Sequence, residues 1–149
     1  MFIQSFKFNR KIAVCILAVL ALILIALILL AGSGDAPKPA GEKLPDCEAR
    51  VEFLMSLGWE ADPASEVAQE ITLPETFSEV LNSYNQLQLQ QGYDLTPYCG
   101  QNCILYTYTL TSYPNCNTEV VACLYLYKDR VIGGDIHSVA MDGFIHGLR

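Results

Sequence analysis

The hydropathy pattern begins with an uninterrupted apolar run near the N-terminus. Residues 12–31 contain no charged or polar side chain, no proline and no glycine. A helix of this length extends roughly 30 Å, which matches the hydrocarbon core of a bilayer. A small domain cannot enclose a helix that is apolar on every face. The pattern therefore predicts a transmembrane helix over residues 12–31.

Basic residues gather on the N-terminal side of this run. Lys7, Arg10 and Lys11 precede it closely, whereas Lys38 and Lys43 follow at a distance and are interspersed with acidic residues. Because loops rich in Lys and Arg stay in the cytoplasm, we expect residues 1–11 to be a cytoplasmic tail and the C-terminal part to be extracytoplasmic. The run exceeds the roughly 7–15 residues of a signal-peptide core, which favours an uncleaved signal anchor in the cell membrane and leaves cleavage open.

A linker separates the apolar run from the remainder of the chain. Residues 32–45 are rich in Gly, Pro and Ala with alternating charge. Such a composition buries little apolar surface and predicts a flexible stalk. Neither a repeat nor a second linker follows it. We therefore expect a single domain over residues 46–149.

Two helices are predicted in this domain. Asp46 is a favourable N-cap for the first, and Gly58 supplies its left-handed stop. Residues 67–73 resemble a short strand, and a second helix is expected to begin at Pro74 and end at Gly92. Its predicted apolar face comprises Phe77, Val80, Leu81, Tyr84 and Leu87, and its predicted solvated face carries Gln86, Gln88, Gln90 and Gln91.

In the C-terminal half the apolar period changes to two, which is typical of strands. Alternation over residues 103–110 and 120–127 predicts two strands, and Lys128-Asp129 predicts a tight hairpin turn into a third. Gly133-Gly134 is expected to bulge that third strand. Together these elements predict an α+β fold, in which two helices pack on one face of a mainly antiparallel sheet of three to four strands.

Two blocks of sequence resemble a known family. The first block comprises Tyr84-Asn85-Gln86-Leu87-Gln88, Gln91-Gly92-Tyr93-Asp94-Leu95, and Tyr98 with Gly100; the second comprises Val131-Ile132-Gly133-Gly134-Asp135 and Asp142-Gly143-Phe144. In this order they are similar to the bacterial family named domain of unknown function 4830, over about residues 48–149. The resemblance implies a small, often membrane-anchored domain, and it transfers no catalytic residue.

The predicted domain is strongly acidic. Residues 46–149 carry fourteen acidic and four basic side chains, which gives a net charge of −10. Nucleic acids and anionic lipid surfaces require clustered Lys or Arg, so both are excluded as partners of this domain. A cationic or neutral partner remains compatible with the charge, and acidity that serves only solubility is the simpler interpretation.

Cysteine spacing leaves several alternatives. Cys15 lies in the apolar run, and four others follow the spacing C-x3-C-x12-C-x6-C: Cys99, Cys103, Cys116 and Cys123. In an exported domain these four are candidates for two disulfide bonds, and Cys47 makes the number of exported thiols odd. Unpaired core thiols are a second alternative. A four-thiolate zinc site is the third, and it is disfavoured because two of the four lie within predicted strands. We predict no metal and no cofactor.

Four residues near the C-terminus carry acid/base or metal-binding chemistry: Asp135, His137, Asp142 and His146. On a strand, Asp135 and His137 project to one face, where the carboxylate orients the imidazole as a general base requires. Histidine with aspartate is also a weak metal-binding set. No established catalytic motif accompanies them, and Asp142-Gly143 is better explained as a turn. These four are weak candidates for a catalytic site.

Two classes of function follow from these patterns. We expect an anchored extracytoplasmic binding or interaction module, because the stalk gives a small domain reach from the membrane and no catalytic signature is present. Its partner is an extracytoplasmic protein or a small ligand. The alternative is a small metal-dependent or acid/base enzyme that uses the C-terminal His/Asp set.

Overall fold

The computed structural model describes residues 41–149. The predicted cytoplasmic tail, the predicted transmembrane helix with Cys15, and residues 32–40 of the predicted stalk lie outside this range. Within residues 41–149, no helix combines the length and the hydropathy that a bilayer crossing requires.

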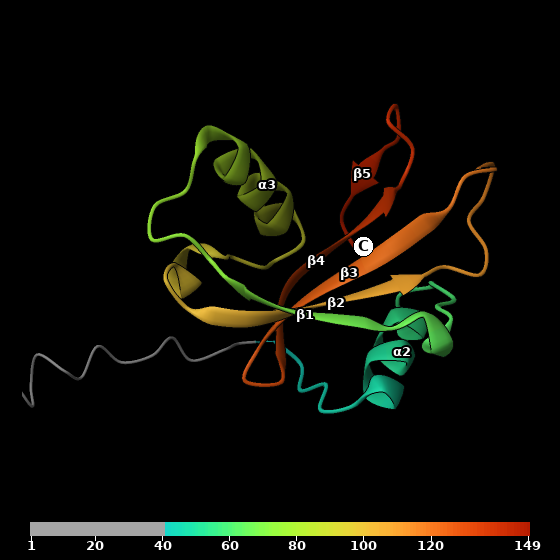
Figure 1. Ribbon diagram of the computed structural model, residues 1–149, viewed down its shortest axis with the longest axis horizontal. Helices are drawn as coiled ribbons and strands as arrows, with labels where there is room; N and C mark the ends of the chain where they lie inside the picture. Colours follow the sequence, from blue (N-terminus) through green and yellow to red (C-terminus); the bar gives the residue numbers. More distant parts are fainter. Residues whose placement is uncertain (1–40) are drawn as a thin grey trace, which may run out of the picture. The chain divides into compact units, whose positions relative to one another are not determined.

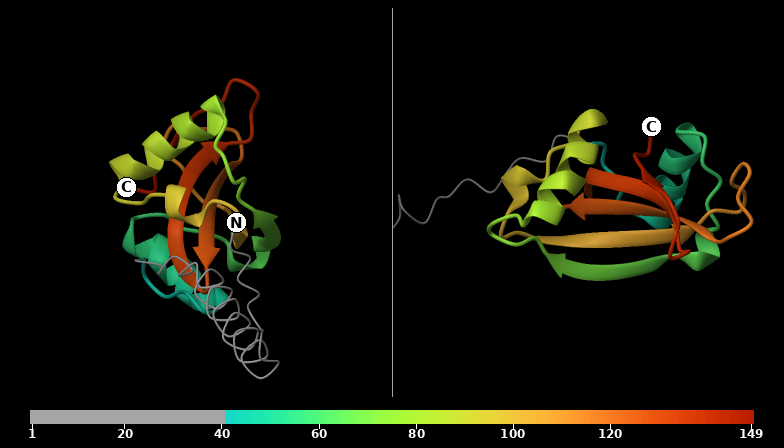
Figure 2. Two further views of the ribbon diagram at one scale, coloured as in Figure 1. Left: turned by 90° about the vertical axis from the view of Figure 1, so that its left-hand side faces the viewer. Right: turned by 90° about the horizontal axis from the view of Figure 1, so that it is seen from above.

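A five-stranded antiparallel sheet forms the centre of the domain (Figure 1). Its strands are β1 (Val67–Thr72), β2 (Asn102–Thr109), β3 (Val120–Tyr127), β4 (Arg130–Ser138) and β5 (Ile145–His146). Each strand pairs with the next one along the chain, and the right-hand view of Figure 2 shows the strands side by side. The predicted antiparallel sheet is confirmed, but three to four strands was too few. The two-residue β5 is too short to produce an alternating pattern.

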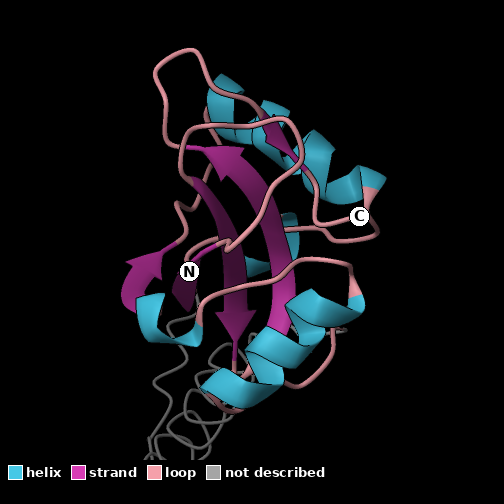
Figure 3. Ribbon diagram, turned by 90° about the vertical axis from the view of Figure 1, so that its right-hand side faces the viewer, coloured by secondary structure: helices cyan, strands magenta, loops and turns pink. Residues whose placement is uncertain are grey.

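Two α-helices, α2 (Cys47–Ser56) and α3 (Glu79–Gln90), accompany the sheet, with short 3-10 helices η1 (Pro63–Ser65) and η2 (Thr96–Tyr98). In Figures 1 and 3, α3 lies above the sheet and α2 below it. The prediction that both helices cover one face was wrong. The central strand β3 is buried at nearly every position because it is covered on both faces, and alternation within a strand does not reveal which helix covers which face.

The sheet separates two hydrophobic cores, to which alternate strand residues contribute. The α2 core contains Phe53 and Leu54 together with Tyr108, Ala122, Leu124 and Ile136. The α3 core contains Cys103, Tyr127 and Ile132, with Tyr84 and Tyr125 packed against it. Each face of the sheet therefore has its own helix and its own set of contacts.

The residues predicted to begin and end the first helix do so at both ends of α2. Asp46 is the N-cap, and its carboxylate accepts a hydrogen bond from the backbone N–H of Ala49 at 2.9 Å. Gly58 follows the helix with a φ of 94°, a conformation that glycine adopts without steric cost. The buried face of α2 includes the charged residue Arg50, which the apolar pattern did not reveal.

Helix α3 begins later than predicted and buries a different face. Its N-cap is Ser78 and not the region of Pro74. Val80, which belongs to the predicted apolar face, is 77% exposed, whereas Gln88 and Gln91 are buried. The prediction that these two glutamines face solvent was therefore wrong.

Hydrogen bonds to the backbone explain the burial of both glutamines. The amide oxygen of Gln88 accepts from Gly134 N at 2.9 Å, and the amide nitrogen of Gln91 donates to Gly134 O at 2.7 Å. The amide oxygen of Gln91 also accepts from Leu148 N at 2.7 Å. These hydrogen bonds offset much of the cost of burying the two amides, although the amide nitrogen of Gln88 is buried without a hydrogen-bond partner among the described residues. The hydrogen bonds of Gln88 and Gln91 connect helix α3 to strand β4 and to the C-terminal segment.

The hairpin between β3 and β4 follows its sequence signal. Lys128 and Asp129 have φ values of 49° and 61°, as a two-residue turn that matches the twist of the strands requires. A bulge follows, since Leu126 pairs with Val131 but Tyr125 pairs with Gly133. The predicted irregularity of this strand is confirmed, one residue before the position expected.

The folded domain begins before Asp46. Leu44 is buried in the α2 core and donates its N–H to Asp129 O at 2.7 Å. Glu42 O accepts from Val131 N at 3.0 Å. Residues 41–44 thus pair with the start of β4, so the end of the predicted stalk is part of the domain.

Candidate functional site

Asp135 and His137 lie side by side on the α3 face of β4. The imidazole Nδ1 of His137 and Oδ1 of Asp135 are 2.7 Å apart. Asp135 is 3% exposed, whereas the His137 side chain is 34% exposed. The structure therefore brings together the two residues that strand periodicity placed on one face. The carboxylate fixes the orientation of an imidazole that solvent can reach.

Tyr84 joins this pair from helix α3. Its hydroxyl donates to Oδ2 of Asp135 at 2.6 Å. Burial, together with the charge of Asp135, raises the pKa of Tyr84 far above its ordinary value, so the hydroxyl keeps its proton as a donor. Each carboxylate oxygen of Asp135 thus has a partner, which is what a buried carboxylate requires. The sequence indicated Tyr84 as an apolar-face residue and did not reveal this contact.

Cys123 lies opposite Asp135 on the neighbouring strand β3. Burial and the nearby charge of Asp135 raise the pKa of Cys123 to about 11. The group is therefore a neutral thiol near neutral pH and a poor nucleophile. One donor atom each from Cys123, Asp135 and His137 lie within 4.8 Å of one another. Within residues 41–149, this is the group of side chains with the spacing that a metal site needs.

These side chains form one wall of an open groove of about 440 Å³. The groove is lined by Tyr84, Leu105, Cys123, Tyr125, Asp135, His137 and Ser138, and by residues of the β4–β5 connection and β5. Met141 and Ile145 belong to this apolar rim and are exposed. The groove thus combines polar groups at its wall with an apolar rim, a composition common in binding sites.

Asp142 and His146 lie apart from the other two C-terminal candidates. Asp142 is exposed in the turn that a hydrogen bond from Gly143 N to Ala140 O closes at 3.0 Å, which confirms the predicted turn. The His146 ring stacks on Phe144 and its Nε2 lies 2.8 Å from the Tyr113 hydroxyl. His146 thus belongs to an aromatic cluster, because the register of β5 turns it away from the face that carries His137.

The described cysteines are all free thiols: Cys47, Cys99, Cys103, Cys116 and Cys123. No disulfide bond joins the last four in the described residues, so the candidate pairing is not shown. Two of these four are held in separate strands, on which they pack as small buried side chains. The four do not gather at one point either, so they form no four-thiolate site.

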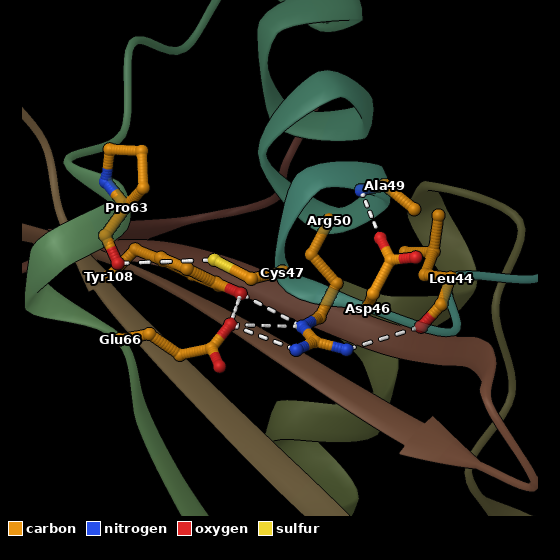
Figure 4. A network of polar contacts seen from close by, with 8 residues as sticks. All are labelled: Leu44, Asp46, Cys47, Ala49, Arg50, Pro63, Glu66 and Tyr108. Carbon is orange, nitrogen blue, oxygen red and sulfur yellow. Dashed lines mark hydrogen bonds and ion pairs between the residues drawn. The ribbon is translucent and has the colours of Figure 1, made fainter.

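A second buried polar cluster lies on the α2 face (Figure 4). The Arg50 guanidinium donates to Glu66 at 2.9 Å, to the Tyr108 hydroxyl at 2.8 Å and to Leu44 O at 3.2 Å. The Tyr108 hydroxyl donates to the same Glu66 carboxylate. The guanidinium also lies 3.7 Å from the centroid of the Tyr106 ring. All its partners belong to the domain, so we interpret this cluster as structural.

Comparison of the amino-acid sequence with models of known protein families identifies the family. Residues 53–136 match the family described as domain of unknown function DUF4830. This chain belongs to the DUF4830 family. Comparisons with curated proteins and with solved structures return no match.

The DUF4830 match confirms the family resemblance found in the sequence. It extends from α2 into β4 and includes Tyr84, Cys123 and Asp135, and it ends one residue before His137. Because the family description names no activity, the chemistry of the site rests on the geometry above. Strand periodicity predicts the contact between Asp135 and His137, whereas Cys123 and Tyr84 join them through strand register and helix placement, which no local pattern reveals.

Proposed function

We propose that this DUF4830 chain is a single-pass membrane protein that presents the domain outside the cytoplasm as a binding module for another extracytoplasmic protein. The groove beside α3 is its binding face. The apolar run over residues 12–31 and the basic residues before it support the anchor and its orientation.

The exposed rim of the groove is the observation that carries the proposal. Met141 and Ile145, which line the groove, are 108% and 54% exposed, and Val139 in the same connection is 56% exposed. These three apolar side chains lie within seven residues, on one connection and one edge strand. Exposed apolar side chains that gather beside a hollow are typical of interaction surfaces. The acidity of the domain favours a neutral or basic partner.

Site-specific photo-crosslinking in membranes of the native host tests this proposal. A diazirine amino acid at position 141 is expected to form a discrete adduct with one protein. The same probe at Met55, which is 60% exposed on α2 on the other face, is the matched control and is expected to form none. An Ile145→Lys substitution should remove the adduct at position 141. An adduct that is equally strong at both positions, or that survives Ile145→Lys, contradicts the proposed binding face.

The contact between Asp135 and His137 favours one alternative, an acid/base enzyme. A half-exposed imidazole that a buried carboxylate orients is able to act as a general base on a molecule in the groove. Replacement of His137 by Gln distinguishes the two functions. An enzyme loses turnover with His137→Gln and keeps it with His146→Gln, whereas a binding module keeps its adduct at position 141 in both variants.

A further inference from the structure

Three side chains of different chemistry converge at the wall of the groove. Cys123 offers a sulfur, Asp135 an oxygen and His137 a ring nitrogen, all within 4.8 Å of one another. They come from paired positions on β3 and β4, so the sheet itself fixes their spacing. Sites built on strands hold their ligands more rigidly than sites built on loops.

We infer that Cys123, Asp135 and His137 bind a divalent transition metal ion of the zinc class. The inference deepens the proposed function and rests on it in one respect, since the ion lies in the same groove. A sulfur, nitrogen and oxygen set suits zinc, whereas calcium and magnesium prefer oxygen ligands alone.

The present spacing is close to that of a bound site. Zinc bonds of about 2.0–2.3 Å place tetrahedral ligand atoms roughly 3.5 Å apart. The three donors lie within 4.8 Å of one another, so the widest gap has to close by at most about 1 Å, whereas His137 Nδ1 and Asp135 Oδ1, now 2.7 Å apart, have to separate by a similar amount. His137 is the ligand that moves most easily, because its side chain is 34% exposed. On binding, the ion replaces the hydrogen bond between His137 and Asp135. The neutral imidazole then carries its one proton on Nε2, so that Nδ1 is free to bind the ion, and the thiol of Cys123 releases one proton to water.

Neighbouring groups already orient two of the three ligands. The Tyr84 hydroxyl donates to Oδ2 of Asp135, which leaves Oδ1 directed to His137. The Thr107 hydroxyl lies 3.7 Å from the sulfur of Cys123. Outer partners of this kind are typical of metal sites. Three protein ligands leave a fourth position on the side of the groove, where water completes the tetrahedron.

Metal titration of the purified full-length protein in detergent tests the inference. After treatment with a chelator, the protein is titrated with Zn²⁺ in competition with a chromophoric chelator, and separately with Co²⁺. We expect one ion per chain and a thiolate-to-cobalt charge-transfer absorption. Cys123→Ser should abolish this absorption and weaken Zn²⁺ binding at least tenfold.

Cys103→Ser is the matched control. Cys103 is also a buried strand thiol on the α3 face, and burial raises its pKa to about 11 as well, but it lies outside the cluster. It should bind like the wild type. His137→Gln changes a partly exposed residue and provides a second variant if Cys123→Ser does not fold. Wild type that binds no ion, or Cys123→Ser and His137→Gln that bind as tightly as wild type, would overturn the inference.

The two proposals fail separately. If an adduct forms at position 141 and the purified protein binds no ion, the groove binds its partner without metal and only the metal inference falls. If the ion binds at Cys123 and no adduct forms, the metal inference stands and the protein-binding function falls.

Discussion

The hydroxyl of Tyr84 on α3 donates to Oδ2 of Asp135 on β4 at 2.6 Å, across 51 residues of chain. This contact joins a helix to the middle of the sheet and gives a buried carboxylate its second partner. The two residues also line the groove together.

Tyr84→Phe tests this relationship. The substitution keeps the ring and removes the donor, so one oxygen of a buried carboxylate loses its partner. We expect the free energy of unfolding to fall by about 1–3 kcal/mol, measured by chemical denaturation. Tyr106→Phe is the control, because its ring under Arg50 is retained. If the free energy of unfolding falls by the same amount in both variants, the hydrogen bond to Asp135 does not stabilise the domain more than an ordinary tyrosine hydroxyl does.

The polar cluster on the other face predicts a larger effect. Arg50→Met fills the same volume but removes the cation that pairs with Glu66 and with the Tyr108 hydroxyl. Loss of one partner of a buried ion pair costs about 3–5 kcal/mol in stability. Arg130→Met is the control, since Arg130 is half-buried and its guanidinium donates to Gly41 O. It should cost less, about 1–2 kcal/mol. Equal losses in denaturation experiments would contradict the structural role of Arg50.

Acid should weaken the same cluster. Burial alone would raise the pKa of Glu66, but hydrogen bonds from Tyr108 and Arg50 outweigh it and hold the pKa below its ordinary value near 4.5. A carboxyl with a lowered folded-state pKa contributes stability above its ordinary value, and this contribution is lost as pH falls through the folded-state pKa. The stability difference between wild type and Glu66→Gln should therefore shrink below about pH 4.5. A difference that stays constant from neutral to acidic pH in denaturation experiments would refute this prediction.

How far the sequence predicts these features depends on how local they are. The Asp46 cap and the Lys128-Asp129 turn are set by neighbouring residues, and both form as predicted. The burial of Gln88 and Gln91 depends on backbone groups more than forty residues away, so a polar pattern indicated solvent. Hydropathy alone cannot identify a buried polar residue whose partners lie in another part of the chain.

The candidate site divides in the same way. The proximity of Asp135 and His137 follows from the period of a single strand. Cys123 joins them through the register of two strands, which the hairpin turn and the bulge set together. Cysteine spacing along the chain suggested disulfides instead, because linear spacing carries no information on which strand positions face each other.

Thiol reactivity tests the proposed topology. The hydroxyl of Thr118 lies 3.1 Å from the Cys116 sulfur, and hydrogen bonding to Thr118 lowers the pKa of Cys116, whereas burial raises that of Cys103 and of Cys123 to about 11. In intact host cells, a membrane-impermeant maleimide should label Cys116 first, as peptide mass spectrometry would measure. Thr118→Val should slow this labelling. Labelling only after the cells are lysed would contradict an extracytoplasmic domain.

Gln91 is expected to hold the C-terminal segment in place. Its amide donates to Gly134 O and accepts from Leu148 N, so Gln91→Ala leaves two buried backbone groups without partners. We expect a loss of about 2–4 kcal/mol in unfolding free energy, and faster hydrogen exchange at the Leu148 amide than in wild type. Gln90→Ala, one position earlier on the exposed side of α3, is the control and should change stability by less than about 0.5 kcal/mol. If exchange at Leu148 is unchanged in Gln91→Ala, the C-terminal segment is held by other contacts. The hydrogen bond from Trp59 Nε1 to Leu148 O, at 2.7 Å, is then the contact to test next.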